Sequence, residues 1–325
     1  MLGQIAITPV HWIGFIVIVL VLLSLDLGVF HRRAHIVTFR EALAWTAIWF
    51  VLSLAFCGAL ARLRNRQEAL EFFTGYIIEL SLSMDNVFVM AVIFAYFRVP
   101  LAYQHRVLFW GILGALVMRG AMIGLGAALI DRFDWMLQVL GAILLLTGLK
   151  MIFVGDKPPD PEKNVVIRTA RSLFPVTGEF SGQKFFVLAN GRTALTPLAL
   201  VLLMVETTDL LFAVDSIPAI FAVTKKPFIV FTSNVFAILG LRSLYFVLAG
   251  AIGYFRYLKV GLSLVLCFIG TKMLLGAWDI DLPITISLAV VASIILTSIV
   301  FSVIVARREQ SAVRKTKDDS EPDSP

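Results

Sequence analysis

Residues 79–86 read Glu-Leu-Ser-Leu-Ser-Met-Asp-Asn, and residues 209–216 read Asp-Leu-Leu-Phe-Ala-Val-Asp-Ser. In each stretch two acids stand six residues apart within an apolar segment, and an amide or hydroxyl side chain follows the second acid. Acids are rare in segments this apolar, so finding the same arrangement twice indicates a duplicated unit.

The similarity continues along the chain. One apolar segment later, residues 115–119 resemble 238–242, and after another segment residues 148–151 resemble 270–273. The three offsets, 130, 123 and 122 residues, are close to constant. They predict a three-helix unit that occurs twice, as repeat one over 72–154 and repeat two over 196–278. Tandem copies of an odd number of spans enter a membrane from opposite sides, which is the inverted repeat typical of secondary transporters.

The composition predicts the surroundings of this unit. Hydrophobic residues make up 59% of the 325 residues and charged residues only 15%, whereas soluble domains are about 45–50% apolar and about 25% charged. We therefore expect an all-α polytopic membrane protein, a single transmembrane domain over 1–305, and no soluble enzyme. About nine transmembrane helices are expected, near 11–30, 41–61, 72–97, 107–130, 135–154, 196–223, 228–250, 259–278 and 284–305.

The charges outside these spans indicate an orientation. With the N-terminus outside, the cytoplasmic loops and tail carry 18 Lys and Arg residues and the opposite side carries 6. The positive-inside rule then favours a multi-pass protein of the inner (plasma) membrane with its N-terminus outside and its C-terminus in the cytoplasm. The formal net charge of +6 is interpreted as this asymmetry, so the lipid bilayer is the expected partner and no nucleic acid is expected.

Two segments are expected to lie outside the bilayer. The cytoplasmic loop 155–195 contains Asn190-Gly191 between two short apolar runs, which predicts a small hairpin. The tail 306–325 is charged and contains Ser and Pro, so a disordered cytoplasmic tail is expected. Cys57 and Cys267 each lie in an apolar run, so neither a disulfide framework nor a thiolate zinc site is expected, and no resident cofactor is predicted.

Ten charged residues fall inside the predicted spans, and each costs at least about 2.5 kcal/mol at the bilayer centre unless it is paired or solvated. They are the acids Asp26, Glu79, Asp85, Glu206, Asp209 and Asp215 and the bases Arg119, Lys150, Arg242 and Lys272. The best candidates for a pseudo-symmetric oxygen site are Asp85, Asn86, Asp215 and Ser216. Oxygen ligands without Cys or His suit Mg²⁺, Ca²⁺ or Mn²⁺.

The remaining charges have several interpretations. Glu79, Glu206 and Asp209 are candidates for metal ligands, proton carriers or ion-pair partners. Charge pairing or proton coupling is expected of the other five charged residues. Ion pairing is the preferred role of Arg119 and Arg242. Lys150, Lys272 and Asp26 can also lie near helix ends. Pro218 removes a hydrogen bond to the carbonyl of Val214, which predicts a discontinuous helix beside Asp215.

These residues resemble a known family. Segments 79–89 and 205–219 resemble the two signature helices of the TerC family, especially its Alx-like branch, as do 232–246 and the hairpin that ends at Thr196-Pro197. The likeness spans about residues 10–305. The family was named for tellurium-ion resistance, and its Alx-like members are associated with manganese export.

The resemblance implies that Asp85 and Asp215 bind metal, with Asn86, Glu79, Glu206 and Asp209 nearby. Leu80 stands where close relatives often carry Lys after the glutamate, so charge pairing by that lysine does not carry over.

The leading hypothesis is therefore an inner-membrane exporter of a divalent metal, most of all Mn²⁺, that works by alternating access and is not an enzyme. The alternative is a membrane scaffold or metal-delivery component of a tellurite or stress-resistance complex, which would bind other membrane proteins through loop 155–195. Intramembrane aspartyl hydrolysis is disfavoured because the Gly-x-Gly-Asp pattern of such proteases is missing. Metal selectivity, direction, coupling ion and oligomeric state stay open at this stage.

Overall fold

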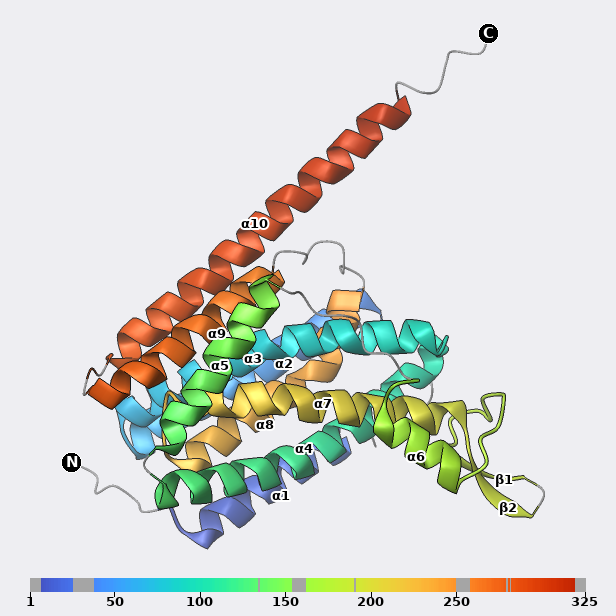
Figure 1. The fold of residues 1–325 in the computed structure, drawn as a ribbon, viewed down its shortest axis with the longest axis horizontal. Coiled ribbons are helices and arrows are strands. Elements are labelled where there is room, and N and C mark those ends of the chain that lie inside the picture. Colours follow the sequence, from blue (N-terminus) through green and yellow to red (C-terminus); the bar gives the residue numbers. More distant parts are fainter. Residues whose placement is uncertain are drawn as a thin grey trace.

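The computed structural model is a bundle of helices with one small β-hairpin (Figure 1). It describes residues 7–25, 38–133, 135–153, 162–189, 191–249, 258–278, 280 and 282–318. The elements are α1 (Pro9–Leu25), α2 (Phe39–Leu63), α3 (Arg66–Tyr96), α4 (Leu101–Arg132), α5 (Met136–Phe153), α6 (Val165–Leu173), β1 (Phe186–Ala189), β2 (Arg192–Leu195), α7 (Pro197–Phe221), α8 (Pro227–Ala249), α9 (Leu258–Leu275), a short 3₁₀ turn (Gly276–Trp278) and α10 (Ile284–Asp318).

A helix lies on each of the nine predicted apolar segments, which confirms the all-α polytopic fold. In the described part of the chain, eight helices are long and apolar enough to cross a membrane. The ninth, α1, has 17 residues. Residues 26–30 of its predicted span, including the candidate Asp26, lie outside the described residues.

Several helices begin earlier than the apolar pattern predicts. The predicted span 72–97 begins at Arg66 in the structure, because Asn65 caps α3 by accepting a hydrogen bond from the backbone N–H of Glu68 at 2.7 Å. Glu68 also pairs with Arg64, and Lys226 lies 3.3 Å from it and 3.2 Å from Glu71. Because these acids have cationic partners, polar residues can occupy the first turns of a spanning helix.

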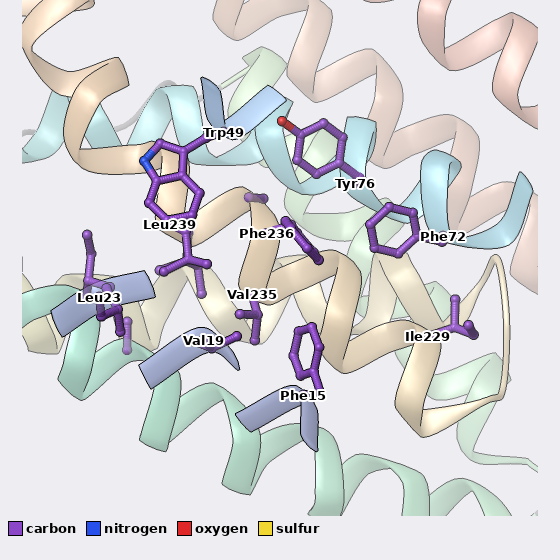
Figure 2. Packing of buried hydrophobic residues seen from close by; sticks show 14 of the residues in the cluster. Phe15, Val19, Leu23, Trp49, Phe72, Tyr76, Ile229, Val235, Phe236 and Leu239 are labelled. Atoms are coloured by element: carbon purple, nitrogen blue, oxygen red, sulfur yellow. The ribbon is translucent and has the colours of Figure 1, made fainter. Parts of the chain in front are cut away.

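Helix α8 is the most enclosed of the candidate spans, because 94% of the residues in its most apolar stretch are buried. Aromatic side chains from three other helices pack against it: in Figure 2, Phe15 of α1 and Phe72 of α3 lie near Phe236, and Trp49 of α2 lies beside Leu239. The rings of Phe72 and Phe236 meet edge to face at 5.7 Å. Since α8 is surrounded, its almost continuous apolar sequence is that of a central helix.

The main helix contacts come in matched pairs. Helix α3 packs on α8 and α7 packs on α4, while α5 packs on α9, α3 on α7 and α4 on α8. Exchanging the first predicted unit (α3, α4, α5) with the second (α7, α8, α9) maps this set of contacts onto itself. A two-fold repeat would produce this pattern, although the repeat itself stays a prediction.

Glycines bring α5 and α9 into backbone contact. A Cβ atom placed on Gly270 would lie 2.7 Å from the carbonyl oxygen of Gly141 and 2.6 Å from the backbone nitrogen of Leu145. A Cβ on Gly148 would lie 2.8 Å from the carbonyl oxygen of Ser263. No side chain larger than hydrogen fits at these crossings.

The predicted loop and tail are more ordered than the sequence suggested. The hairpin is present, with Phe186 paired to Leu195 and Ala189 to Arg192; Asn190 of its turn lies outside the described residues. Before it comes α6, an amphipathic helix that the sequence analysis did not predict, capped by Asn164. Helix α10 continues to Asp318, into the expected disordered tail, because this stretch is rich in the strong helix formers Arg, Lys, Glu and Gln. In Figure 1 it extends well beyond the bundle.

Candidate functional site

The centre of the candidate site is the buried guanidinium group of Arg119 on α4, whose side chain is 3% exposed. Its Nε and Nη2 donate to the two carboxylate oxygens of Asp209 at 3.1 and 2.8 Å. Its Nη1 donates to Glu79 Oε1 and to Ser216 Oγ, the latter at 3.3 Å. One arginine from α4 therefore ties an acid of α3 to an acid of α7, and the ion pairing expected of Arg119 is observed.

A second link joins α3 and α7 directly. The amide nitrogen of Asn86 donates to Asp209 Oδ1 at 2.7 Å. Because Asn86 lies level with Asp209 while Glu79 and Ser216 share Arg119, the two helices run antiparallel here. Asn86 and Ser216 are equivalent positions in the two predicted repeats, and so are Glu79 and Asp209. The direct bond joins Asn86 of the first repeat to Asp209 of the second. The Arg119 bridge joins the reverse combination, Ser216 and Glu79.

A cavity of about 710 Å³ lies beside this cluster. Its lining comes mainly from α3, α5, α7 and α9, and Arg119 of α4 reaches it. Eleven polar or charged residues line it: Glu79, Ser83, Asp85, Asn86, Arg119, Thr147, Lys150, Thr208, Asp215, Ser216 and Lys259. The four residues of the predicted oxygen site, Asp85, Asn86, Asp215 and Ser216, all lie on this cavity.

The two aspartates are half-buried and lie at different heights. Asp215 Oδ1 accepts a hydrogen bond from Thr147 Oγ1 of α5 at 3.2 Å. On each helix, six residues separate the second acid from the first, a rise of about 9 Å. Because α3 and α7 are antiparallel, Asp85 lies about level with Asp209, and Asp215 about level with Glu79. The aspartates thus lie on either side of the Arg119 cluster along the bundle.

Two oxygen acceptors on the cavity are buried and open to a further donor or a cation. Within the part of the chain that the structure describes, Glu79 Oε2 and Asn86 Oδ1 have no hydrogen-bond partner. Among the same residues, no three His, Cys, Asp or Glu side chains are grouped so that they could hold a metal ion. The acids do not converge because Arg119 holds Glu79 and Asp209 while Asp85 and Asp215 are separated along the helices.

Three of the other predicted residues, Glu206, Arg242 and Lys272, lie apart from the cavity lining. Glu206 faces α4, where its Oε1 is 2.1 Å from the place that a Cβ of Gly114 would occupy. Arg242 lies with Asp209 on a separate internal cavity of about 10 Å³. Lys272 lies in the last turn of α9, and Asp26 is outside the described residues. Lys150, by contrast, lines the main cavity near the end of α5.

Four polar residues of the cavity lining, Ser83, Thr147, Thr208 and Lys259, were not predicted from the sequence, and one predicted feature is not present. Ser83, Thr147 and Thr208 are neutral residues in apolar spans, and Lys259 is the first residue of the predicted span 259–278, next to a cytoplasmic loop, so none of them stood out. Helix α7 is continuous through Pro218, so the predicted discontinuity beside Asp215 is wrong. Proline in this last turn removes one hydrogen bond to Val214, another residue of the cavity lining, without breaking the helix.

These features define a class: a polytopic integral membrane protein with a charged cavity among its helices. Comparison with known proteins narrows the class, because the family described as "Integral membrane protein TerC family" matches residues 64–310. The chain belongs to the TerC family, as its signature helices indicated.

Individual relatives match almost end to end. A membrane protein of Myxococcus xanthus is 52% identical over 300 residues, which is 92% of this chain and 94% of the relative. Alx of Escherichia coli K12, whose name describes a membrane-bound redox modulator, is 47% identical over 311 residues (91% and 94%). A membrane protein of Rickettsia bellii is 41% identical over 293 residues (90% and 97%). No solved structure matches the chain significantly.

Proposed function

We propose that the protein exports a divalent metal ion, Mn²⁺ before others, across the inner membrane by alternating access of its two groups of helices. The observation that carries this proposal is the shared cavity, which is lined both by Asp85 and Asn86 of α3 and by Asp215 and Ser216 of α7. The orientation proposed with it has the N-terminus outside and the C-terminus in the cytoplasm.

The donor set supports a hard cation. The lining offers carboxylate, amide and hydroxyl oxygens, the ligands that Mg²⁺, Ca²⁺ and Mn²⁺ prefer, and Glu79 Oε2 and Asn86 Oδ1 have acceptor capacity left. Six waters occupy about 180 Å³ at about 30 Å³ each, so a cavity of about 710 Å³ can hold an ion with its first hydration shell. The ion would then pass between Asp85 and Asp215 through water.

A flux assay tests the proposal. Purified protein is reconstituted into liposomes, and Mn²⁺ movement is followed with a trapped fluorescent indicator while Mg²⁺, Ca²⁺ and Zn²⁺ compete. We expect Asp85→Asn and Asp215→Asn each to lower the Mn²⁺ flux at least tenfold. Asp131→Asn, at the exposed end of α4, is the matched control and should leave the flux unchanged. Wild-type flux of none of the four ions, or full flux in both aspartate variants, would refute the proposal.

A scaffold function is the second candidate, and two observations favour it. The hairpin projects from one end of the bundle (Figure 1) with Leu188 82% exposed and Phe186 59% exposed, and the name of the Escherichia coli relative describes a modulator and not a transporter. A scaffold would carry no metal in liposomes, yet deleting residues 186–195 would abolish the cellular resistance phenotype. An exporter would keep its flux in liposomes after the same deletion.

A further inference from the structure

The cavity between α3 and α7 has a second kind of lining besides its polar residues. Ten apolar residues complete it: Leu82, Phe88, Val89, Val92, Met151, Leu211, Phe212, Val214, Leu262 and Leu266. A hydrated ion uses only about 180 Å³ of the roughly 710 Å³, which is the size of a site for a whole organic ligand. Transport of a metal ion therefore does not account for the apolar walls.

Part of this apolar lining is exposed at the edge of the bundle. Leu211 is 65% exposed, Val214 45% and Val92 39%. Exposed apolar side chains on spanning helices face the hydrocarbon of the bilayer. Because these residues belong both to the cavity and to the outer surface, the cavity opens sideways between α3 and α7 toward the lipid chains.

Two lysines lie on the same cavity at one end of the bundle. Lys150 is exposed in the last turn of α5, and Lys259 is half-buried in the first turn of α9. The glycine contacts show that α5 and α9 are antiparallel, since Gly148 meets Ser263 and Gly141 meets Met273. Both lysines therefore lie at the same helix ends, at the height where lysine side chains reach the lipid headgroups.

The cavity lining as a whole holds three acids (Glu79, Asp85 and Asp215) and three bases (Arg119, Lys150 and Lys259). The two lysines at its one end, together with the apolar walls, match an amphiphile with an anionic head. Basic pockets between spanning helices bind phospholipid headgroups, and the lysine ammonium groups are suited to a phosphate. We propose that the cavity holds a phospholipid with a net negative headgroup, whose phosphate lies between Lys150 and Lys259 and whose acyl chain passes over the apolar rim at Leu211 and Val92.

This lipid site is independent of whether metal is transported, because it rests on the lysines and on the apolar rim. If metal also uses the cavity, the lipid occupies the space beside Asp85 and Asp215. The access of water to these two aspartates then depends on whether the lipid is bound. The inference therefore adds a ligand class to the site and places a second binding function next to the aspartates.

Lipid retention tests the inference on the full-length protein. Protein in detergent is incubated with phosphatidylglycerol or phosphatidylcholine of identical chains, and bound lipid is counted by native mass spectrometry. We expect the Lys150→Gln/Lys259→Gln double variant to retain at least fivefold less phosphatidylglycerol. The Lys150→Arg/Lys259→Arg variant should retain the wild-type amount, and so should Lys225→Gln, which removes an exposed lysine beyond the end of α7.

A second measurement does not depend on a variant. Phosphatidylglycerol with a photoreactive group in its acyl chain should crosslink to peptides from the exposed apolar rim on α3 and α7. Equal retention of both lipids, undiminished phosphatidylglycerol in the double glutamine variant, or crosslinks confined to α2 and α10 would each overturn the proposal. Displacement of the lipid by millimolar inorganic phosphate would overturn it too, because the acyl chain would then contribute no binding.

Discussion

Replacing Arg119 with methionine should destabilise the protein more than any other single arginine substitution on α4. The arginine is buried and donates four hydrogen bonds, two to Asp209 and one each to Glu79 and Ser216. Methionine replaces the apolar stem of arginine but leaves two buried carboxylates without the guanidinium counter-charge.

The magnitude follows from separating the hydrogen bonds from the charge. Interhelical hydrogen bonds in membrane proteins average about 0.6 kcal/mol, so four of them account for about 2.4 kcal/mol. Removing one partner of a buried ion pair costs about 3–5 kcal/mol, since the remaining charge is left uncompensated. We expect Arg119→Met to lose about 3–5 kcal/mol. The triple variant Glu79→Gln/Arg119→Met/Asp209→Asn, which has no such charge, should lose only about 2 kcal/mol.

Unfolding by increasing SDS in mixed micelles, followed by tryptophan fluorescence, measures both values. Arg132→Met, at the exposed end of the same helix, is the control and should change the free energy of unfolding by under about 0.5 kcal/mol. If Arg119→Met loses no more than this control, or if removing both carboxylates restores nothing, then the cluster does not hold α3, α4 and α7 together as described.

Two further variants test the packing and the loop. Gly270→Ala should cost about 1–3 kcal/mol in the same assay, because its Cβ would enter the backbone of α5; Gly124→Ala, where nothing lies within 4 Å, should cost nothing, and equal losses would contradict the close crossing. Thr196→Val removes hydroxyl donation to the carbonyl oxygens of Lys184 and Phe185 at 2.7 and 3.2 Å. It should speed hydrogen exchange in the hairpin at least tenfold, whereas exposed Thr193→Val should not; unchanged exchange in both would show that this hydroxyl does not fix the hairpin.

The sequence was sufficient for the fold class because the spans are long apolar runs, and bilayer thickness fixes their length. It was less accurate at helix ends. Glu68 and Glu71 look like loop residues until Lys226, which is remote in sequence, is found beside them. The amphipathic pattern after Asn164 could have predicted α6, since Asn is a preferred N-cap and Ile167, on the third helical position, is buried.

The candidate site was predictable in its residues but not in its connections. The repeated spacing singled out Asp85 and Asp215, and both line one cavity, while their binding of a metal stays a prediction. Periodicity could not show that Arg119 would form ion pairs with both Glu79 of α3 and Asp209 of α7. Glu206 shares a helix face with Asp209, yet the absent side chain of Gly114 lets it turn toward α4, a contact that depends on how two helices cross.

The glycine contacts between α5 and α9 limit how this bundle can rearrange. Sliding one helix along the other by a single residue would carry a Cβ-bearing position to Gly141, Gly148 or Gly270, where the facing backbone leaves room for hydrogen alone. The two helices therefore behave mechanically as one strut. If the cavity opens and closes as the proposed alternating access requires, α3 and α7 would tilt against that strut, and Lys150 and Lys259 would keep a fixed spacing.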